Sequence, residues 1–181
     1  MSDQRGFTLA EILVVMAIIM MLSGFMVRNF ARGRVDLDQA RAVVMEALRE
    51  TQSLALAGAQ FQSTLRCGYG IRLEETGYTL YAGPVASTDC ATHDRSYNAG
   101  TDPIVRSATF PAGTVELVGG TIDIFFEPPD PVMYVCSGGT CDAATSTTAV
   151  VRRVGAACTA ANPSADCRAI SIATSGLITA Q

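Results

Sequence analysis

The feature that most constrains this chain is an apolar stretch near its start, residues 7–27, which contains a single charged side chain. A helix rises about 1.5 Å per residue, so this stretch would span roughly 31 Å, close to the thickness of the hydrocarbon core of a bilayer. Placing the Glu11 carboxylate in a membrane costs about 2.5–3.5 kcal/mol on insertion scales, and such residues usually have a partner or a function. The stretch therefore predicts a membrane-spanning helix with one functional carboxylate. The alternative is a plain single-pass anchor in which Glu11 is incidental.

The residues before the apolar stretch do not form an ordinary secretory signal. Such a signal has an apolar core of about 7–15 residues, followed by a cleavage site with small residues. Here the apolar segment is longer, and no Ala-x-Ala sequence follows it. The short polar leader, residues 1–6, ends at Gly6. Cleavage after Gly6 would keep the apolar helix on the mature protein, which would then begin at Phe7.

The residues around this junction read RGFTLAE over positions 5–11 and resemble the class III leader junction of type IV pilins and type II secretion pseudopilins. The resemblance implies cleavage between Gly6 and Phe7 by a prepilin peptidase and N-methylation of the new Phe7 amine. It also implies that Glu11 pairs with the N-terminal amine of a neighbouring subunit during filament assembly. A cation in the same low-dielectric layer would offset the cost of burying that carboxylate.

The charges beyond the apolar stretch raise a question of orientation. Arg28, Arg32 and Arg34 follow the stretch, and the positive-inside rule would place them in the cytoplasm. Two observations favour the opposite orientation, because the cysteines after the helix suit an oxidising compartment and because pilin-like leaders are recognised as a motif. We expect a single-pass protein of the bacterial inner membrane with a periplasmic C-terminal domain, which is later built into a pilus or pseudopilus filament.

All six cysteines lie in the C-terminal part of the chain. An even number in an exported domain predicts disulfides, and six cysteines allow fifteen connectivities, of which nearest-neighbour pairing is the simplest. A metal site is the alternative, but the spacing of two residues that is typical of a zinc knuckle is missing. We expect disulfides, with no metal and no cofactor. The cysteines are Cys67, Cys90, Cys136, Cys141, Cys158 and Cys167.

Residues 28–57 keep a helical period but become one-sided. Apolar and small residues recur at a spacing of three to four, while charged residues such as Arg41 and Glu46 lie largely off that stripe. Gly58 is a typical C-terminal signal for a helix. The pattern predicts a helix whose second half packs on its own domain. The stripe consists of Leu37, Ala40, Val44, Leu48, Thr51, Gln52 and Ala55, widened by Val43, Ala47 and Leu54.

Residues 58–181 change to a β pattern, in which short runs of Val, Ile, Tyr and Phe alternate with clusters of Gly, Pro, Asp and Ser. We predict loops over 84–103 and 137–147 and a hairpin turn at residues 75–77. The predicted fold class is α+β, a long N-terminal helix followed by an antiparallel β domain. Strands are predicted over residues 66–74, 77–83, 104–110, 113–118, 120–127, 132–136, 148–154, 168–174 and 176–180.

This order of elements resembles one branch of the pilin superfamily, the GspH/FimT-type minor pilins. The residues that carry the resemblance are the FPAG sequence at 110–113, which follows a strand, and the closing strand pair at 168–180. Some members of this branch bind DNA with arginines after the last glycine, but Leu177 and Thr179 stand there in this chain. Residues 58–181 also contain seven Arg against eleven Asp and Glu, a net charge of −4, which does not favour nucleic acid as a partner.

The sequence contains no clear catalytic constellation. His93 lies alone in a polar loop, where we expect a solvated histidine rather than a catalytic base. Four acidic residues could in principle gather a calcium ion, which prefers several oxygen ligands, but they lack an EF-hand spacing and are expected to form a solvated acidic surface. These residues are Asp123, Glu127, Asp130 and Asp142.

Taken together, these features predict a minor pilin or pseudopilin that acts by assembly and not by catalysis. Its expected partners are other pilin or pseudopilin subunits, the prepilin peptidase, the inner-membrane assembly platform and the lipid bilayer. Glu11 argues against the tip subunit of the secretion complex, which in that family lacks this acid. Three alternatives remain open: a DNA-receptor pilin for DNA uptake, a membrane-anchored periplasmic enzyme, and an abundant main filament subunit.

Overall fold

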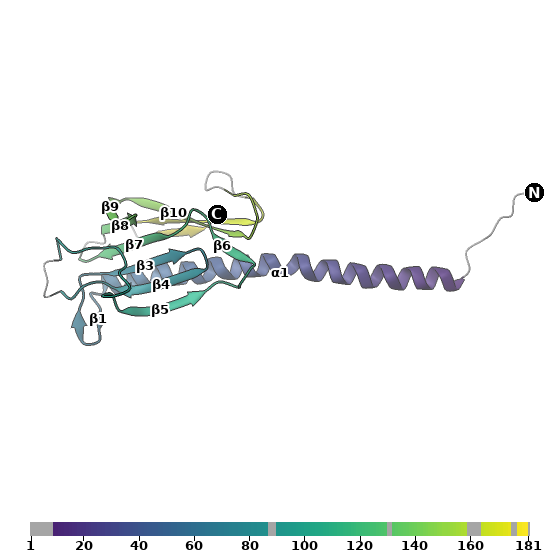
Figure 1. Cartoon of the computed structure of the whole chain (residues 1–181), viewed down its shortest axis with the longest axis horizontal. Coiled ribbons are helices and arrows are strands. Elements are labelled where there is room, and N and C mark those ends of the chain that lie inside the picture. Colours follow the sequence, from purple (N-terminus) through teal and green to yellow (C-terminus); the bar gives the residue numbers. More distant parts are fainter. Residues whose placement is uncertain (1–8, 87–89, 130–131, 159–163, 175–176, 181) are drawn as a thin grey trace, which may run out of the picture. The chain divides into compact units, whose positions relative to one another are not determined.

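The computed structural model describes residues 9–86, 90–129, 132–158, 164–174 and 177–180, without the side chains of residues 27–33 and 180. The chain forms two compact units, Met1–Val35 and Asp36–Gln181, which are described separately below. Helix α1, Leu9–Leu56, forms the described part of the first unit, and its C-terminal part belongs to the second (Figure 1).

In the first unit, the segment Leu9–Met26 of α1 is long and apolar enough to cross a membrane. Its mean hydropathy is 2.4, and none of its side chains is buried by the rest of the chain. Leu9, Met21 and Phe25, for example, are 78%, 82% and 73% exposed. Since apolar surface on this scale is unfavourable in water, the segment requires a lipid or protein environment that this chain does not itself provide.

In the second unit, the remaining part of α1 buries one face, and this face is the predicted stripe. All seven predicted members of the stripe are at least 94% buried, and Val44 and Leu48 are completely buried. The helix ends in a Schellman motif, in which the Gly58 amide donates to the Ala55 carbonyl and the Ala59 amide to the Leu54 carbonyl. Gly58 has the positive φ of 54° that this motif requires, so the predicted role of this glycine is confirmed.

The larger sheet of the second unit has six strands in the order β5-β4-β3-β7-β8-β9, and every neighbouring pair is antiparallel (Figure 1). Residues 75–76 form the predicted hairpin turn between β3 and β4. The strands are β3 (Tyr69–Glu74), β4 (Gly77–Ala82), β5 (Ile104–Thr109), β7 (Ile122–Glu127), β8 (Val132–Ser137) and β9 (Thr140–Ala144).

The smaller sheet has four strands in the order β12-β11-β10-β6, again antiparallel. A separate two-stranded hairpin, β1 with β2, follows the helix. The strands are β6 (Val115–Leu117), β10 (Ser146–Arg153), β11 (Cys167–Ala173), β12 (Ile178–Ala180), β1 (Gln60–Phe61) and β2 (Thr64–Leu65). The α+β class with antiparallel sheets is therefore confirmed.

A single hydrophobic core joins the helix and both sheets of the second unit. Leu48 of the helix, Ile71 and Ile124 of the larger sheet and Ile170 of the smaller sheet are all completely buried in it. Because both sheets contribute alternate residues to this one core, each sheet keeps a second, outer face.

Two strand predictions were wrong. The stretch 137–147, predicted as a loop, contains β9 and the start of β10. Its Gly, Ser and Thr content suggested a loop, but Cys136 and Cys141 face each other across β8 and β9, and Gly138 and Gly139 take the positive φ values of a tight hairpin turn. The β1–β2 hairpin was also missed, because Gln62 and Ser63 adopt positive φ without a glycine to signal the turn.

Candidate functional site

The N-terminal end of the chain contains the predicted processing and assembly residues. Gly6 and Phe7 lie outside the described residues. Glu11 lies in the first turn of α1 and is the only charged residue of the described span Leu9–Met26. An acidic side chain in the first turn interacts favourably with the helix dipole. The structure thus places one carboxylate at the start of a fully exposed apolar span.

The six cysteines form three disulfides, Cys67–Cys90, Cys136–Cys141 and Cys158–Cys167, which is the nearest-neighbour pairing. The first closes a loop of sequence separation 23 and ties the irregular segment after β4 to the start of β3. The second joins facing residues of the β8–β9 hairpin. Since all six cysteines are paired, a thiolate metal site is excluded by the disulfides.

The outer face of the six-stranded sheet, turned away from the hydrophobic core, has two rows of side chains that follow from the strand register. Arg72, Asp123 and Cys136 are direct neighbours across β3, β7 and β8. The next row contains Tyr81, Phe125 and Tyr134, with Gly70 between the first two. A Cβ atom at Gly70 would collide with the Tyr81 ring, so glycine allows this ring to lie flat across β3. The face is thus one polar row beside one aromatic row.

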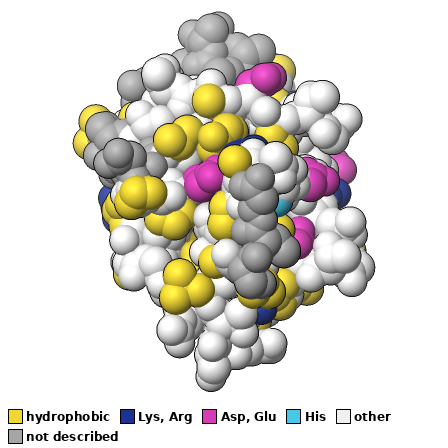
Figure 2. All heavy atoms as spheres, turned by 90° about the vertical axis from the view of Figure 1, so that its left-hand side faces the viewer, with side chains coloured by type: hydrophobic (Ala, Val, Ile, Leu, Met, Phe, Trp, Pro, Cys, Tyr) yellow, Lys and Arg dark blue, Asp and Glu magenta, His cyan; other side chains and the backbone are white. Residues whose placement is uncertain are grey.

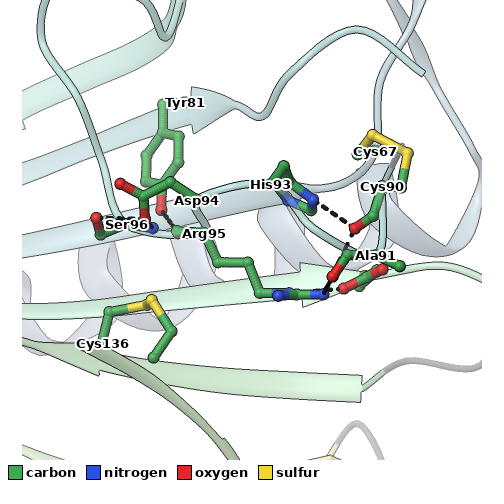
Figure 3. Close-up of polar contacts among 11 residues, drawn as sticks. Cys67, Tyr81, Cys90, Ala91, His93, Asp94, Arg95, Ser96 and Cys136 are labelled. Atoms are coloured by element: carbon green, nitrogen blue, oxygen red, sulfur yellow. Dashed lines mark hydrogen bonds and ion pairs between the residues drawn. A yellow bond between two sulfur atoms is a disulfide. The ribbon is translucent and has the colours of Figure 1, made fainter. Parts of the chain in front are cut away.

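The segment 90–102 covers the aromatic row, and we refer to it as the covering loop. Its alternate residues turn toward the sheet: His93 lies edge-on to Phe125, Arg95 lies 4.1 Å above the Tyr134 ring, and Tyr97 lies 5.0 Å from Tyr81. Figure 3 shows the labelled loop residues and the disulfide Cys67–Cys90 at the edge of this region. The composition of the loop suggested only irregular structure, but the two-residue spacing of these three side chains was a signal that could have been used.

Asp123 attaches the covering loop to the sheet. It is 5% exposed, and it accepts hydrogen bonds from the Tyr81 hydroxyl at 2.7 Å and from the Tyr97 amide at 2.5 Å. Burial raises the pKa of the Asp123 carboxyl, while these two donors and the charge of Arg72 oppose the rise. Burial and the neighbouring Asp123 charge also raise the pKa of Tyr81, so its phenol stays neutral.

A second attachment is the ion pair between Arg95 and Glu127, with 2.8 Å between Nε and Oε2. Both side chains are less than one-fifth exposed, and the guanidinium also packs on Tyr134. The prediction that Asp123 and Glu127 belong to a solvated acidic surface was therefore wrong, because each is held by a specific donor from the covering loop. Asp142 is exposed as expected, and Asp130 lies outside the described residues.

His93 was predicted to be a solvated loop residue, and this was also wrong. The imidazole is half-buried against Phe125, and its Nδ1 lies 2.5 Å from the carbonyl oxygen of Cys90 (Figure 3). Among the described residues, the imidazole contacts one backbone carbonyl and one apolar ring, and no hydrogen bond joins it to a carboxylate as in a catalytic dyad. A role in packing the covering loop accounts for its position.

A small polar cavity of about 330 Å³ opens beside the covering loop. Its walls come from Arg72, Ser96, Tyr97 and Asp123 and from the turn at residues 137–139. Within the described residues, no group of three or more His, Cys, Asp or Glu side chains is arranged to hold a metal ion. The described residues that line the cavity include no paired nucleophile and base.

Most arginines of residues 58–181 form ion pairs with acidic residues of the same chain. Ion pairs engage six of the seven arginines between residues 58 and 181, and Arg66 donates to the Gly83 carbonyl and lies over the Phe61 ring. Seen from one end, the molecular surface intersperses hydrophobic, acidic and other polar side chains and shows no broad basic area (Figure 2). The paired arginines are Arg72, Arg95, Arg106, Arg152, Arg153 and Arg168.

Comparison with known proteins gives one match. Residues 1–27 match the family model described as the prokaryotic N-terminal methylation motif. No curated protein and no solved structure matches the chain. The motif is the prepilin signal of type IV pilin-like proteins, and it implies processing by a prepilin peptidase and assembly with other pilins. The apolar helix that follows it fits a membrane-anchored pilin. The motif, the apolar helix and the α+β domain together support the type IV pilin and pseudopilin superfamily, and the motif points to a structural pilin subunit and not to an enzyme.

Proposed function

We propose that this protein is a minor pilin or pseudopilin of a type IV pilus or of a type II secretion pseudopilus, and that it serves pilus biogenesis or protein secretion. It crosses the bacterial inner membrane once, with residues 36–181 in the periplasm, and then enters the filament. The observation that carries the proposal is the match to the methylation motif followed by a fully exposed apolar helix with a single carboxylate. The three disulfides support the oxidising side of the membrane for the β domain.

In the proposed maturation, the peptidase cleaves after Gly6 and the Phe7 amine is methylated. Glu11 then lies four residues from a new positive charge at the same depth in the membrane. Both charges are costly in a low-dielectric layer when alone, and pairing with the corresponding group of a neighbour offsets that cost. The pair would set the register of each subunit in the filament, while the apolar side chains of Leu9–Met26 supply the packing surface.

We place the protein among the GspH/FimT-type minor subunits because two antiparallel sheets follow the helix and because β11 and β12 close the domain. In this role the β domain contacts adjacent subunits or a target. The amount of protein in sheared filaments distinguishes a minor from a main subunit: a small fraction of total pilin supports the proposal, and a dominant fraction contradicts it.

A DNA-receptor role for DNA uptake is the alternative function. It is less well supported, since the arginines of the β domain already have partners and Leu177 is exposed at a position where DNA-binding members of the GspH/FimT branch carry arginine. A gel-shift assay at several salt concentrations tests it. Binding that weakens steeply with salt would indicate phosphate contacts and would favour the DNA-receptor role.

The decisive experiment is mass spectrometry of the membrane-extracted protein, both intact and as N-terminal peptides, from strains with and without the prepilin peptidase. We expect a mature N-terminus at N-methyl-Phe7 that depends on the peptidase. The variant Gly6→Val should accumulate as the full-length precursor, and Gly24→Val is a matched control because a Cβ atom there meets no neighbour within 4 Å. A start at Met1 in both strains would refute the proposal.

A further inference from the structure

The hydroxyl group of Tyr81 lies between two hydrogen-bond acceptors. Its oxygen is 2.7 Å from Oδ1 of Asp123 and 2.9 Å from the carbonyl oxygen of Arg95. A phenol has one hydrogen to donate, so it can satisfy only one of these acceptors at a time. Figure 3 shows the Tyr81 hydroxyl meeting the covering loop at Arg95.

The protonation state of Asp123 decides whether every acceptor in this cluster receives a hydrogen. With Asp123 ionised, the Tyr81 hydrogen goes to the carboxylate, and the Arg95 carbonyl receives no hydrogen from Tyr81. With Asp123 protonated, the carboxyl O–H donates to the Tyr81 oxygen, Tyr81 donates to the Arg95 carbonyl, and Oδ2 still accepts from the Tyr97 amide. The added proton therefore changes a network with one acceptor too many into one in which every short contact is a hydrogen bond.

Some groups around Asp123 raise its pKa and others lower it. Burial and the negative charge of Asp102 in the covering loop favour the protonated form. The hydrogen bonds from Tyr97 and Tyr81 and the charge of Arg72 on β3 favour the ionised carboxylate. Asp94, also in the loop, acts on Tyr81 in the same sense as Asp102. On the other side, β8 contributes Cys136, which is held in a disulfide and does not titrate. The balance of these influences is a raised pKa for Asp123.

We propose that the covering loop is a proton-dependent latch, fastened to the outer sheet face when Asp123 is protonated and loosened at the Arg95 backbone when Asp123 is ionised. The Cys67–Cys90 disulfide and the Arg95–Glu127 ion pair keep the loop attached in both states. The effect is therefore local, at residues 94–98, above Phe125 and Tyr81. Loosening exposes part of the aromatic row. The latch depends only on the β domain and does not rest on the proposed function.

The test is hydrogen–deuterium exchange of the full-length chain in detergent micelles between pH 4.5 and 7.5, corrected for the intrinsic exchange rate at each pH. In the wild type, we expect peptides from the covering loop to be about two- to tenfold more protected at the acid end, the range that the net value of one hydrogen bond implies. Asp123→Asn should keep the high protection at every pH, since its amide group donates to Tyr81 as the protonated acid does. Asp142→Asn removes an exposed carboxylate on β9 and should behave like the wild type.

The variant Tyr81→Phe removes the shared hydroxyl and should lose the pH dependence while remaining poorly protected. If a variant fails to fold, the pH dependence of exchange in the wild type still tests the proposal. The ¹³C chemical shift of the Asp123 carboxyl, measured in micelles, reports the protonation of Asp123 directly. Loop protection that does not change with pH, or an Asp123→Asn variant that retains the wild-type pH dependence, would overturn the latch.

Discussion

The two units of this chain differ in how their apolar side chains are covered. In Leu9–Met26, no side chain is buried by the described part of the chain, although the segment has a mean hydropathy of 2.4. In Asp36–Gln181, the helical stripe and two sheets bury a common core in which many side chains are completely inaccessible. The apolar side chains of the first unit therefore need lipid or other subunits to cover them, whereas those of the second are covered by contacts within the unit.

This comparison predicts that a substitution at Glu11 affects assembly and leaves folding unchanged. We expect Glu11→Leu to insert into the membrane normally, because it removes a charge from the span, but to enter filaments at least tenfold less, since the pairing charge is gone. The measurement is the amount of protein in sheared filaments relative to the membrane fraction. Glu46→Gln is the matched control, because Glu46 is an exposed carboxylate of the same helix. Its ion pair with Arg106 is long, at 3.7 Å, and an exposed pair of this kind contributes little to stability. Normal incorporation of Glu11→Leu would argue against the pairing role.

A substitution in the core of the second unit should instead lower the stability of the fold. Leu48→Ala removes a completely buried side chain from the core and should lower the free energy of unfolding by about 2–5 kcal/mol. Thermal unfolding of the full chain in micelles, followed by near-ultraviolet circular dichroism, measures the effect. Leu56→Ala, on a residue that is 51% exposed, should change stability by less than about 0.5 kcal/mol. Equal losses for the two variants would contradict the assignment of the buried face.

Within the second unit, the three disulfides should stabilise the fold to different extents, because the effect of a disulfide increases with the length of the loop that it closes. Chain-entropy arguments give about 3.5 kcal/mol for Cys67–Cys90, about 2.7 for Cys158–Cys167 and about 2.2 for Cys136–Cys141. Paired Cys→Ser substitutions, compared by denaturant unfolding, test this order. Removal of Cys67–Cys90 should also raise exchange in the covering loop, and a variant that lost stability without that change would show that the disulfide does not anchor the loop.

The smallest effect concerns pH. The pKa of Asp123 is raised in the folded state, so its favourable contribution to stability is present below the ordinary carboxyl pKa of about 4 and is lost as pH rises through the folded value. Relative to the wild type, Asp123→Asn should therefore be equally stable near pH 4 and more stable at neutral pH, by about 0.5–1.5 kcal/mol. Thermal unfolding of both proteins across this pH range gives the difference. A wild type that gains stability over Asp123→Asn toward neutral pH would show that the sign is wrong.

Much of the fold could be predicted from local patterns. The stripe from Leu37 to Ala55 follows from a spacing of three to four residues, and the end of the helix from Gly58, because both depend on helical geometry alone. The strand β7 could also be predicted, because its first residues alternate between apolar and polar and its apolar residues favour a strand. The hairpin of β9 was not, since its residues have weak strand propensity and are held by their register opposite β8.

The candidate site also contains features that local sequence predicts and features that it does not. The prepilin signal, the apolar span, Glu11 and the even number of cysteines can be read from the amino-acid sequence, because each is a contiguous motif or a property of composition. Only the tertiary structure brought Tyr81, Asp123 and the Arg95 carbonyl together, since they come from β4, β7 and the covering loop. Which acidic residue is buried, and whether His93 packs on a ring, depends on contacts between segments distant in sequence. Such contacts are set by strand register and loop closure, and no local pattern encodes them.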